Sequence, residues 1–384
     1  MQLIFPFMIS YSTKLLQRML RHAAYLPGWH TKRKIVVFES DDWGSIRTSG
    51  KKELEKLSEK YPASFSDPYN RLDSLESNED LEALFDVLRS VRDSKGYPAV
   101  LTANTVMANP DFKRIEEDGY SSYAFEPFTE TLKRYPNRDR VRDLISQGMI
   151  EKVYHPQLHG REHVNINQWL SGLRKGNEEL LAAFRCGMYG VTLSESKSMR
   201  KNFTAAFDFE TREELEEHKL ILAEAQHLFK AEFGYDSASF IAPSYIWHPD
   251  LHPEMRRLGI RYLQGLSFQG IPNPGGRDFK KEIRYLGKTR NGITHIVRNS
   301  FFEPVQDRSN NTVNDCLIRM REVFKNGRPA IIGTHRVNFI GSLDENNRKN
   351  NLRQFKMLLN AIMEKWPEAE FMTTDQLGDI ITCQ

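Results

Sequence analysis

The chain is organised around Val153-Tyr154-His155-Pro156-Gln157-Leu158-His159-Gly160, in which two histidines stand four positions apart. Two imidazoles at this spacing can converge on one metal ion from a helix turn or a tight loop. A largely apolar run, residues 149–154, leads to the first histidine, and Gly148 before it favours a helix end. The stretch is therefore predicted to be a buried strand that delivers His155 and His159 to a loop.

A second stretch, Glu39-Ser40-Asp41-Asp42-Trp43-Gly44, lies much earlier and directly follows the apolar run 35–38. A carboxylate can join two histidines in a three-ligand metal site that leaves a position open for water or substrate. Each stretch alone is a weak indication, because paired aspartates are often turn residues and spaced histidines occur by chance. Together, at two strand ends, they predict a metal-hydrolase site.

Strand and helix patterns alternate along most of the chain. The predicted strands beyond these two stretches are residues 98–103, 238–242, 260–263, 294–299, 329–333 and 370–372. Because parallel strands need crossover connections, this alternation predicts an α/β fold, a distorted TIM-like (β/α) barrel of seven or eight parallel strands. The active site of such a barrel lies at the carboxyl ends of its strands.

The barrel is expected to occupy residues 31–384 as one domain, with an inserted helical segment at about 160–210. Residues 1–30 carry an amphipathic helix, apolar on one face and basic on others. We expect this helix to pack on the barrel, and its basic residues also allow a peripheral contact with a membrane surface or a partner.

Four motifs, in this order, resemble those of the polysaccharide deacetylase family, carbohydrate esterase family 4. They are Glu39-Ser40-Asp41-Asp42, His155-Pro156-Gln157-Leu158-His159, Ile241-Ala242-Pro243-Ser244-Tyr245 and Ile331-Ile332-Gly333-Thr334-His335. The chain departs from the family pattern at three positions. Glu39 replaces a threonine, Pro156 replaces a serine or threonine, and Ile241 replaces an arginine.

The resemblance implies that Asp42, His155 and His159 hold a divalent metal ion, and zinc suits two imidazoles and a carboxylate best. It also implies that Asp41 is the catalytic base and His335 the acid that protonates the leaving amine. The spacing of the two aspartates does not by itself tell which is base and which is ligand.

Four further side chains near the same rim are predicted to bind the substrate: Trp43, Asn104, Tyr245 and Trp247. As alternatives, Asn104 fits an ordinary turn residue, and the aromatic loop 243–247 fits a structural plug.

The absence of an arginine at Ile241 leaves Asp41 without the cation that the family uses to orient its base. A nearby cation lowers the pKa of a carboxylate by favouring its charged form. We expect a substitute from another element. Arg298, near the end of a predicted strand, is the first candidate, and Arg47, in the loop after Asp42, is the second.

Composition narrows the partners and the compartment. The 54 basic and 51 acidic residues nearly cancel to a net charge of +3, which gives no indication of a nucleic-acid surface. Three cysteines are too few for a disulfide framework and fit a reducing compartment, and no apolar stretch is long enough for a membrane span. The expectation is a cytoplasmic protein whose partner is an acetylated carbohydrate.

The predicted function is metal-dependent deacetylation, by amide or ester hydrolysis, of an acetylated saccharide. One alternative is a glycoside hydrolase on a related barrel, which would need two carboxylates flanking a glycosidic bond. The other is a non-catalytic sugar-binding protein on a decayed deacetylase barrel, which the isoleucine at position 241 favours and the retained aspartates and histidines oppose.

Overall fold

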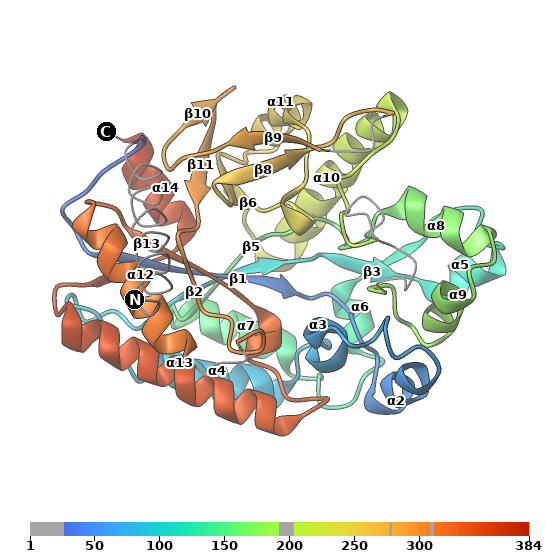
Figure 1. Ribbon diagram of the computed structural model, residues 1–384, viewed down its shortest axis with the longest axis horizontal. Helices are drawn as coiled ribbons and strands as arrows, with labels where there is room; N and C mark the ends of the chain where they lie inside the picture. The colour runs from blue at the N-terminus through green and yellow to red at the C-terminus, as the bar shows by residue number, and fades with distance from the viewer. Residues whose placement is uncertain (1–26, 192–202, 276–278, 308–310, 384) are drawn as a thin grey trace, which may run out of the picture.

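The computed structural model describes residues 27–191, 203–275, 279–307 and 311–383, and it has a ten-stranded sheet rolled into a barrel at its centre, with helices outside (Figure 1). The strands of this sheet are β1 (Ile35–Trp43), β2 (Leu101–Thr105), β5 (Tyr154–Leu158), β6 (Ser239–Phe240), β7 (Tyr262–Gly265), β10 (Thr289–Arg290), β11 (Ile293–Val297), β12 (Ser300–Phe301), β13 (Ala330–His335) and β14 (Glu370–Met372). Two small antiparallel sheets stand apart: β3 (Ala108–Pro110) with β4 (Phe125–Pro127), and β8 (Phe268–Ile271) with β9 (Lys280–Ile283).

The larger helices follow the strands in alternation. They are α2 (Lys51–Lys60), α4 (Asn78–Arg89), α7 (Val141–Ile150), α8 (Ile166–Arg174), α9 (Glu178–Arg185), α10 (Arg212–Phe233), α12 (Thr312–Lys325), α13 (Glu345–Lys365) and α14 (Thr374–Thr382). Shorter turns of helix are α3 (Pro68–Leu72), α5 (Phe112–Glu117), α6 (Phe128–Leu132), α11 (His252–Arg257), η2 (Pro243–Tyr245), η3 (Pro249–Leu251) and η4 (Arg336–Asn338). None of the helices in the described ranges is long and apolar enough to cross a membrane.

The barrel closes through one stretch of chain that changes its strand partner. β11 pairs in parallel with β7, and β12, two residues later, pairs in parallel with β13. Between them, Arg298 N donates to Gly265 O at 2.9 Å and Asn299 N donates to Ile331 O at 3.0 Å. The ring β1, β2, β5, β6, β7, β11–β12 and β13 is therefore continuous and parallel, which confirms the predicted barrel.

Side chains along each strand alternate between the inside and the outside of the barrel, and this divides the hydrophobic core into two parts. Ile35 and Val37 point into the barrel and pack with Leu377 and Ile381, so α14 fills the amino-terminal end of the barrel. Phe38 belongs to the larger outer core and meets Phe355 of α13 edge to face, with ring centroids 5.2 Å apart. The inner positions become polar toward the carboxyl ends of the strands, where the site lies.

Local sequence signals explain where several helices begin and end. Ser77 and Asp80 form a capping box at the start of α4, and Thr211 caps α10, which ends at Gly234 with a φ of 82°. The described part of the 160–210 segment contains α8 and α9, which lie with α2 and α3 beyond the carboxyl end of β1 (Figure 1). The predicted amphipathic helix of residues 1–30 lies almost entirely outside the described residues.

Gly148 does not end a helix, as its sequence suggests, but lies inside α7. Its role is close packing, because a Cβ added there would lie 2.7 Å from Phe85 Cζ of α4 and 2.9 Å from Tyr154 Cβ of β5. The hydrogen atom of glycine lets α7 approach the strand that leads to the site.

Gly148→Ala is therefore expected to destabilise the protein by about 1–3 kcal/mol through overpacking, although alanine is the better helix former by about 1 kcal/mol. Urea unfolding measures the change, with Ser146→Ala on the exposed face of α7 as the control. A Gly148→Ala protein as stable as the wild type would contradict this packing.

Candidate metal centre and its surroundings

The site begins with a bulge at the end of β1. Side chains of a regular strand alternate between its two faces, so Glu39 and Asp41 point into the barrel and Asp42 would point out. The register of β1 against β2 shifts between Ser40 and Trp43, and Asp42 adopts a φ of 77°. A bulge with one left-handed residue re-aims the following side chain. Both adjacent aspartates can therefore serve one site.

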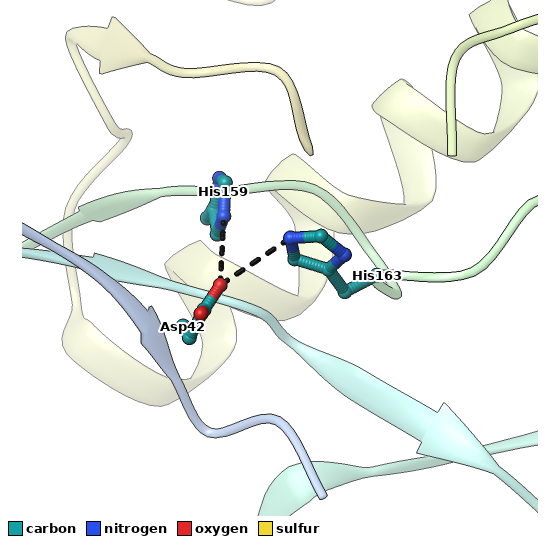
Figure 2. Close-up of side chains that lie close together, drawn as sticks. All are labelled: Asp42, His159 and His163. Atoms are coloured by element: carbon teal, nitrogen blue, oxygen red, sulfur yellow. Dashed lines mark ion pairs between the residues drawn. The ribbon is translucent and has the colours of Figure 1, made fainter. Parts of the chain in front are cut away.

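Asp42 lies at the centre of a buried group with His159 and His163. Its Oδ1 is 3.4 Å from His159 Nε2 and 3.3 Å from His163 Nε2, and the three candidate ligand atoms lie within 4.8 Å of one another. Figure 2 shows the carboxylate at the end of β1 facing both rings, which come from the loop after β5.

The chemistry of this group fits a divalent cation. Asp42 Oδ1 is buried and accepts no hydrogen bond within the described part of the chain. His159 Nδ1 lies 2.9 Å from the carbonyl oxygen of Ile241, and donating to it leaves the lone pair on Nε2 directed at Asp42. Burial lowers the pKa of His163, which keeps that imidazole neutral. Two imidazoles and one carboxylate suit zinc, with a further coordination position open.

The predicted ligand His155 is not part of this group. Its Nε2 lies 3.1 Å from Asp375 Oδ2 and 3.0 Å from Gln157 Nε2, and its ring stacks on Tyr235. The physical reason is that His155 is inside β5, where four residues cover about 13 Å, so it lies far below His159. The two histidines that converge on Asp42 are His159 and His163, and both lie in the loop after β5.

Asp41 is held by the arginine that was the first candidate from the sequence. Arg298 donates from Nη1 to Asp41 Oδ2 and from Nη2 to Asp41 Oδ1, both at 2.7 Å, and from Nε to Glu39 Oε2 at 2.7 Å. Asn104 Nδ2 also donates to Asp41 Oδ1 at 2.8 Å. Burial alone would raise the pKa of Asp41, but Arg298, helped by His159 and His335, outweighs it, and the pKa lies below its usual value. The expected contact between Arg298 and Asp41 is therefore present.

His335 stands across the site from the metal group, at the end of β13. Its Nε2 lies 3.8 Å from Asp41 Oδ2, and its Nδ1 lies 2.6 Å from Glu303 Oε1. Burial would lower the pKa of His335, but the attraction and hydrogen bond of Glu303, together with the attraction of Asp41 and Asp42, outweigh it and raise this pKa to about 9. The imidazole is therefore protonated at neutral pH.

These groups line one cavity of about 130 Å³. Tyr245 and Arg47 line it as well, and Arg298 donates to the Tyr245 hydroxyl at 3.0 Å. Arg47 does not contact Asp41 and lies over the ring of Tyr69 instead.

The other three predicted substrate residues do not reach the cavity. Trp43 is fully buried against Tyr154, Trp247 is 2% exposed, and Asn104 is fully buried and used by Asp41. Each of these side chains is enclosed by its own neighbours, so the structure does not bring it to this cavity. Tyr245, in the same loop as Trp247, does line the cavity.

Two residues of the site, His163 and Glu303, were not predicted from the sequence. His163 repeats the four-residue spacing in His159-Gly160-Arg161-Glu162-His163, and this repeat was the available signal. Glu303 follows Ser300-Phe301-Phe302, so a strand prediction extended through these residues would have placed an acid at its end.

Comparison with known proteins adds little beyond the fold. No protein-family model matches the sequence, and no curated protein matches it. Among solved structures, a putative polysaccharide deacetylase from Mycobacterium smegmatis aligns with a TM-score of 0.42 at 10% identity, over 93% of each chain. A pseudoenzyme of carbohydrate esterase family 4 from Bacillus anthracis aligns with a TM-score of 0.37 at 10% identity, over 91% of this chain and 67% of the other.

A 4-alpha-glucanotransferase from Thermococcus litoralis aligns with a TM-score of 0.44 at 12% identity, over 90% of this chain but only 40% of that enzyme. The structural neighbours thus include a putative polysaccharide deacetylase and a 4-alpha-glucanotransferase. At such identities the likeness is one of fold, so any functional argument has to come from the site itself.

The geometry predicts that the purified protein binds about one divalent ion, and that His159→Ala and His163→Ala lose it. His155→Ala is the matched control, because it removes an imidazole from the same barrel without touching Asp42, and it should keep the ion. Metal analysis after dialysis measures the content. Loss of the ion in His155→Ala with retention in His163→Ala would overturn this ligand set.

Proposed function

We propose that this protein is a metal-dependent hydrolase that removes acetyl groups from an acylated saccharide. The observation that carries the proposal is the placement of a three-ligand group, an ionised carboxylate and a protonated imidazole around one cavity. Hydrolysis of an amide needs an activated water, stabilisation of the developing oxyanion and protonation of the leaving amine.

Asp42, His159 and His163 are the side chains that would hold the ion. Bound there, a divalent cation would supply Lewis acidity, which polarises a carbonyl and makes a water molecule more acidic. Asp41 next to them is the group placed to accept a proton. Its low pKa makes it a weak base, so it is suited to a water whose acidity has already been raised.

His335 is the group placed to donate a proton. Paired groups whose environments move their pKa values apart divide the roles of acid and base between them. Here Arg298 keeps Asp41 ionised and Glu303 keeps His335 protonated. The Asp41 carboxylate therefore takes the proton from water, and the His335 imidazolium supplies one to the leaving nitrogen. His335 Nε2 and Asp41 Oδ2 are 3.8 Å apart.

The direct test is acetate release from a panel of N-acetylated and O-acetylated sugars. His335→Ala should lower kcat by about 10²- to 10⁴-fold while leaving the metal content unchanged, because a general acid acts on the chemical step without holding the ion. Asp41→Asn should lower kcat by a comparable factor with the metal retained. Metal loss together with activity in His335→Ala would make this residue a ligand instead.

The same panel separates the rival functions. Release of a reducing sugar without acetate would indicate glycoside hydrolysis, which uses two carboxylates on either side of the bond. Sugar binding with no product would indicate a non-catalytic barrel. Both rivals have to account for the buried arginine that keeps Asp41 charged, a feature that binding alone does not need.

The pH dependence follows from the His335–Glu303 pair. Because the pKa of His335 is raised to about 9, its proton is present at neutral pH, and activity that needs it should fall as pH rises through that value. Glu303→Gln removes the attraction, lowers this pKa and should move the alkaline limb of kcat to lower pH. Asn338, which donates to Glu303 Oε2, offers Asn338→Ala as a milder control. An unmoved alkaline limb in Glu303→Gln would remove His335 as the acid.

A further inference from the structure

We propose that Arg47 is the specificity residue of this site and binds a carboxylate or phosphate group carried by the substrate. The inference rests on the proposed function, because it names the class of acylated sugar that the site would take. It starts from a guanidinium that lines the same cavity as Asp42 and His335 without an ion-pair partner there.

The hydrogen-bonding edge of Arg47 is open. Its only hydrogen bond to a described residue is a long one, from Nε to Asn70 Oδ1 at 3.4 Å. Neither terminal nitrogen has a hydrogen bond or ion pair to a described residue, and neither is among the buried atoms that lack a partner. The two terminal nitrogens, with four N–H groups, are therefore not fully buried, and the residue lines the cavity.

The same guanidinium is held in place from its sides. Its centre lies 5.2 Å from the centroid of the Tyr69 ring, a cation–π contact. Gly190 packs against the side chain so closely that a Cβ added there would lie 3.3 Å from Nε. An arginine whose side chain and guanidinium plane are packed, and whose terminal N–H groups are free, is preorganised to bind a planar carboxylate or a tetrahedral phosphate.

The charge of the loaded site favours the same kind of ligand. Among the described residues that line the cavity, two carboxylates, Asp41 and Asp42, stand against two cations, Arg47 and His335. A divalent ion held by Asp42 would add two positive charges to this lining. A cationic cavity attracts anions and repels cationic substrates.

A simple counter-ion role for Arg47 beside Asp42 fits the contacts less well than a role in binding an anion. Asp42 attracts Arg47 electrostatically, but a counter-ion would be expected to contact the carboxylate, and Asp42 Oδ1 has no hydrogen-bond donor in the described chain. The site contains a second arginine, Arg298, that shows how a counter-ion is built, with two bonds of 2.7 Å to its carboxylate.

The test compares three N-acetylated sugars with the metal-loaded protein: N-acetylglucosamine, its 6-phosphate and N-acetylmuramic acid. Titration calorimetry gives their affinities, and acetate release gives kcat/KM. A charged bidentate arginine contact corresponds to an affinity gain of about 10- to 100-fold. At least one anionic sugar should exceed the neutral one by this factor in wild type, and the preference should disappear in Arg47→Met.

Two further variants make the result specific. Arg47→Lys keeps the charge without the fork and should retain part of the preference. Arg71→Met removes a positive charge from the exposed side of α3, the helix that carries Tyr69, and should retain all of the preference. A thermal melt of each variant identifies any that do not fold. If Arg47→Met does not fold, the sugar preference of Arg47→Lys is compared with that of the wild type instead.

The outcomes separate this inference from the function on which it rests. Equal binding of neutral and anionic sugars, or a preference that survives in Arg47→Met, overturns the role of Arg47 even if acetate is released. An anion preference lost in Arg47→Met, with no acetate from any sugar, supports Arg47 as an anion site and overturns the deacetylase. Binding of none of the three sugars overturns both.

Discussion

The buried contact between Arg298 and Asp41 is the interaction on which the site and the barrel both depend. Removing a carboxylate from water costs several kcal/mol unless a cation and hydrogen bonds replace the solvent. Arg298 supplies two hydrogen bonds to Asp41 and a third to Glu39, and its own side chain is fully buried. The backbone of the same residue joins the closing strand to Gly265 of β7. Closure of the ring therefore delivers the cation that keeps the proposed base ionised.

Two of the three positions at which the chain differs from the motifs that it resembles lie at this site. With isoleucine at position 241, the cation comes instead from the β11–β12 stretch, and Glu39 accepts its Nε–H. Gly333 leaves room for it, since a Cβ there would lie 2.8 Å from Arg298 Cδ. Ile241 keeps a role through its backbone, because its carbonyl oxygen orients His159. Of the three positions that differ, Glu39 therefore contacts the cation, and Ile241 contacts a candidate metal ligand through its backbone.

Much of the fold was predictable because it depends on local signals and on alternation. The capping box at Ser77, the glycine stop at Gly234 and the regular spacing of apolar strands are all visible in the sequence, and together they imply parallel strands that close on themselves. The site was harder to predict from the sequence, because it depends on the residue at which each strand ends. His155 and His159 have the right spacing for a helix or loop, but the first lies within β5, and strand geometry separates them. Glu303 belongs to no motif and reaches His335 only through the pairing of β12 with β13.

The proposed hydrolase needs one ion position between the carboxyl end of β1 and the loop after β5. Anomalous X-ray scattering from crystals soaked in zinc, with data collected on both sides of the zinc edge, locates that position independently of any activity. One dominant peak is expected about 2.0–2.2 Å from Asp42 Oδ1, His159 Nε2 and His163 Nε2. A peak at His155 and Asp375, with none beside Asp42, would contradict this ligand set.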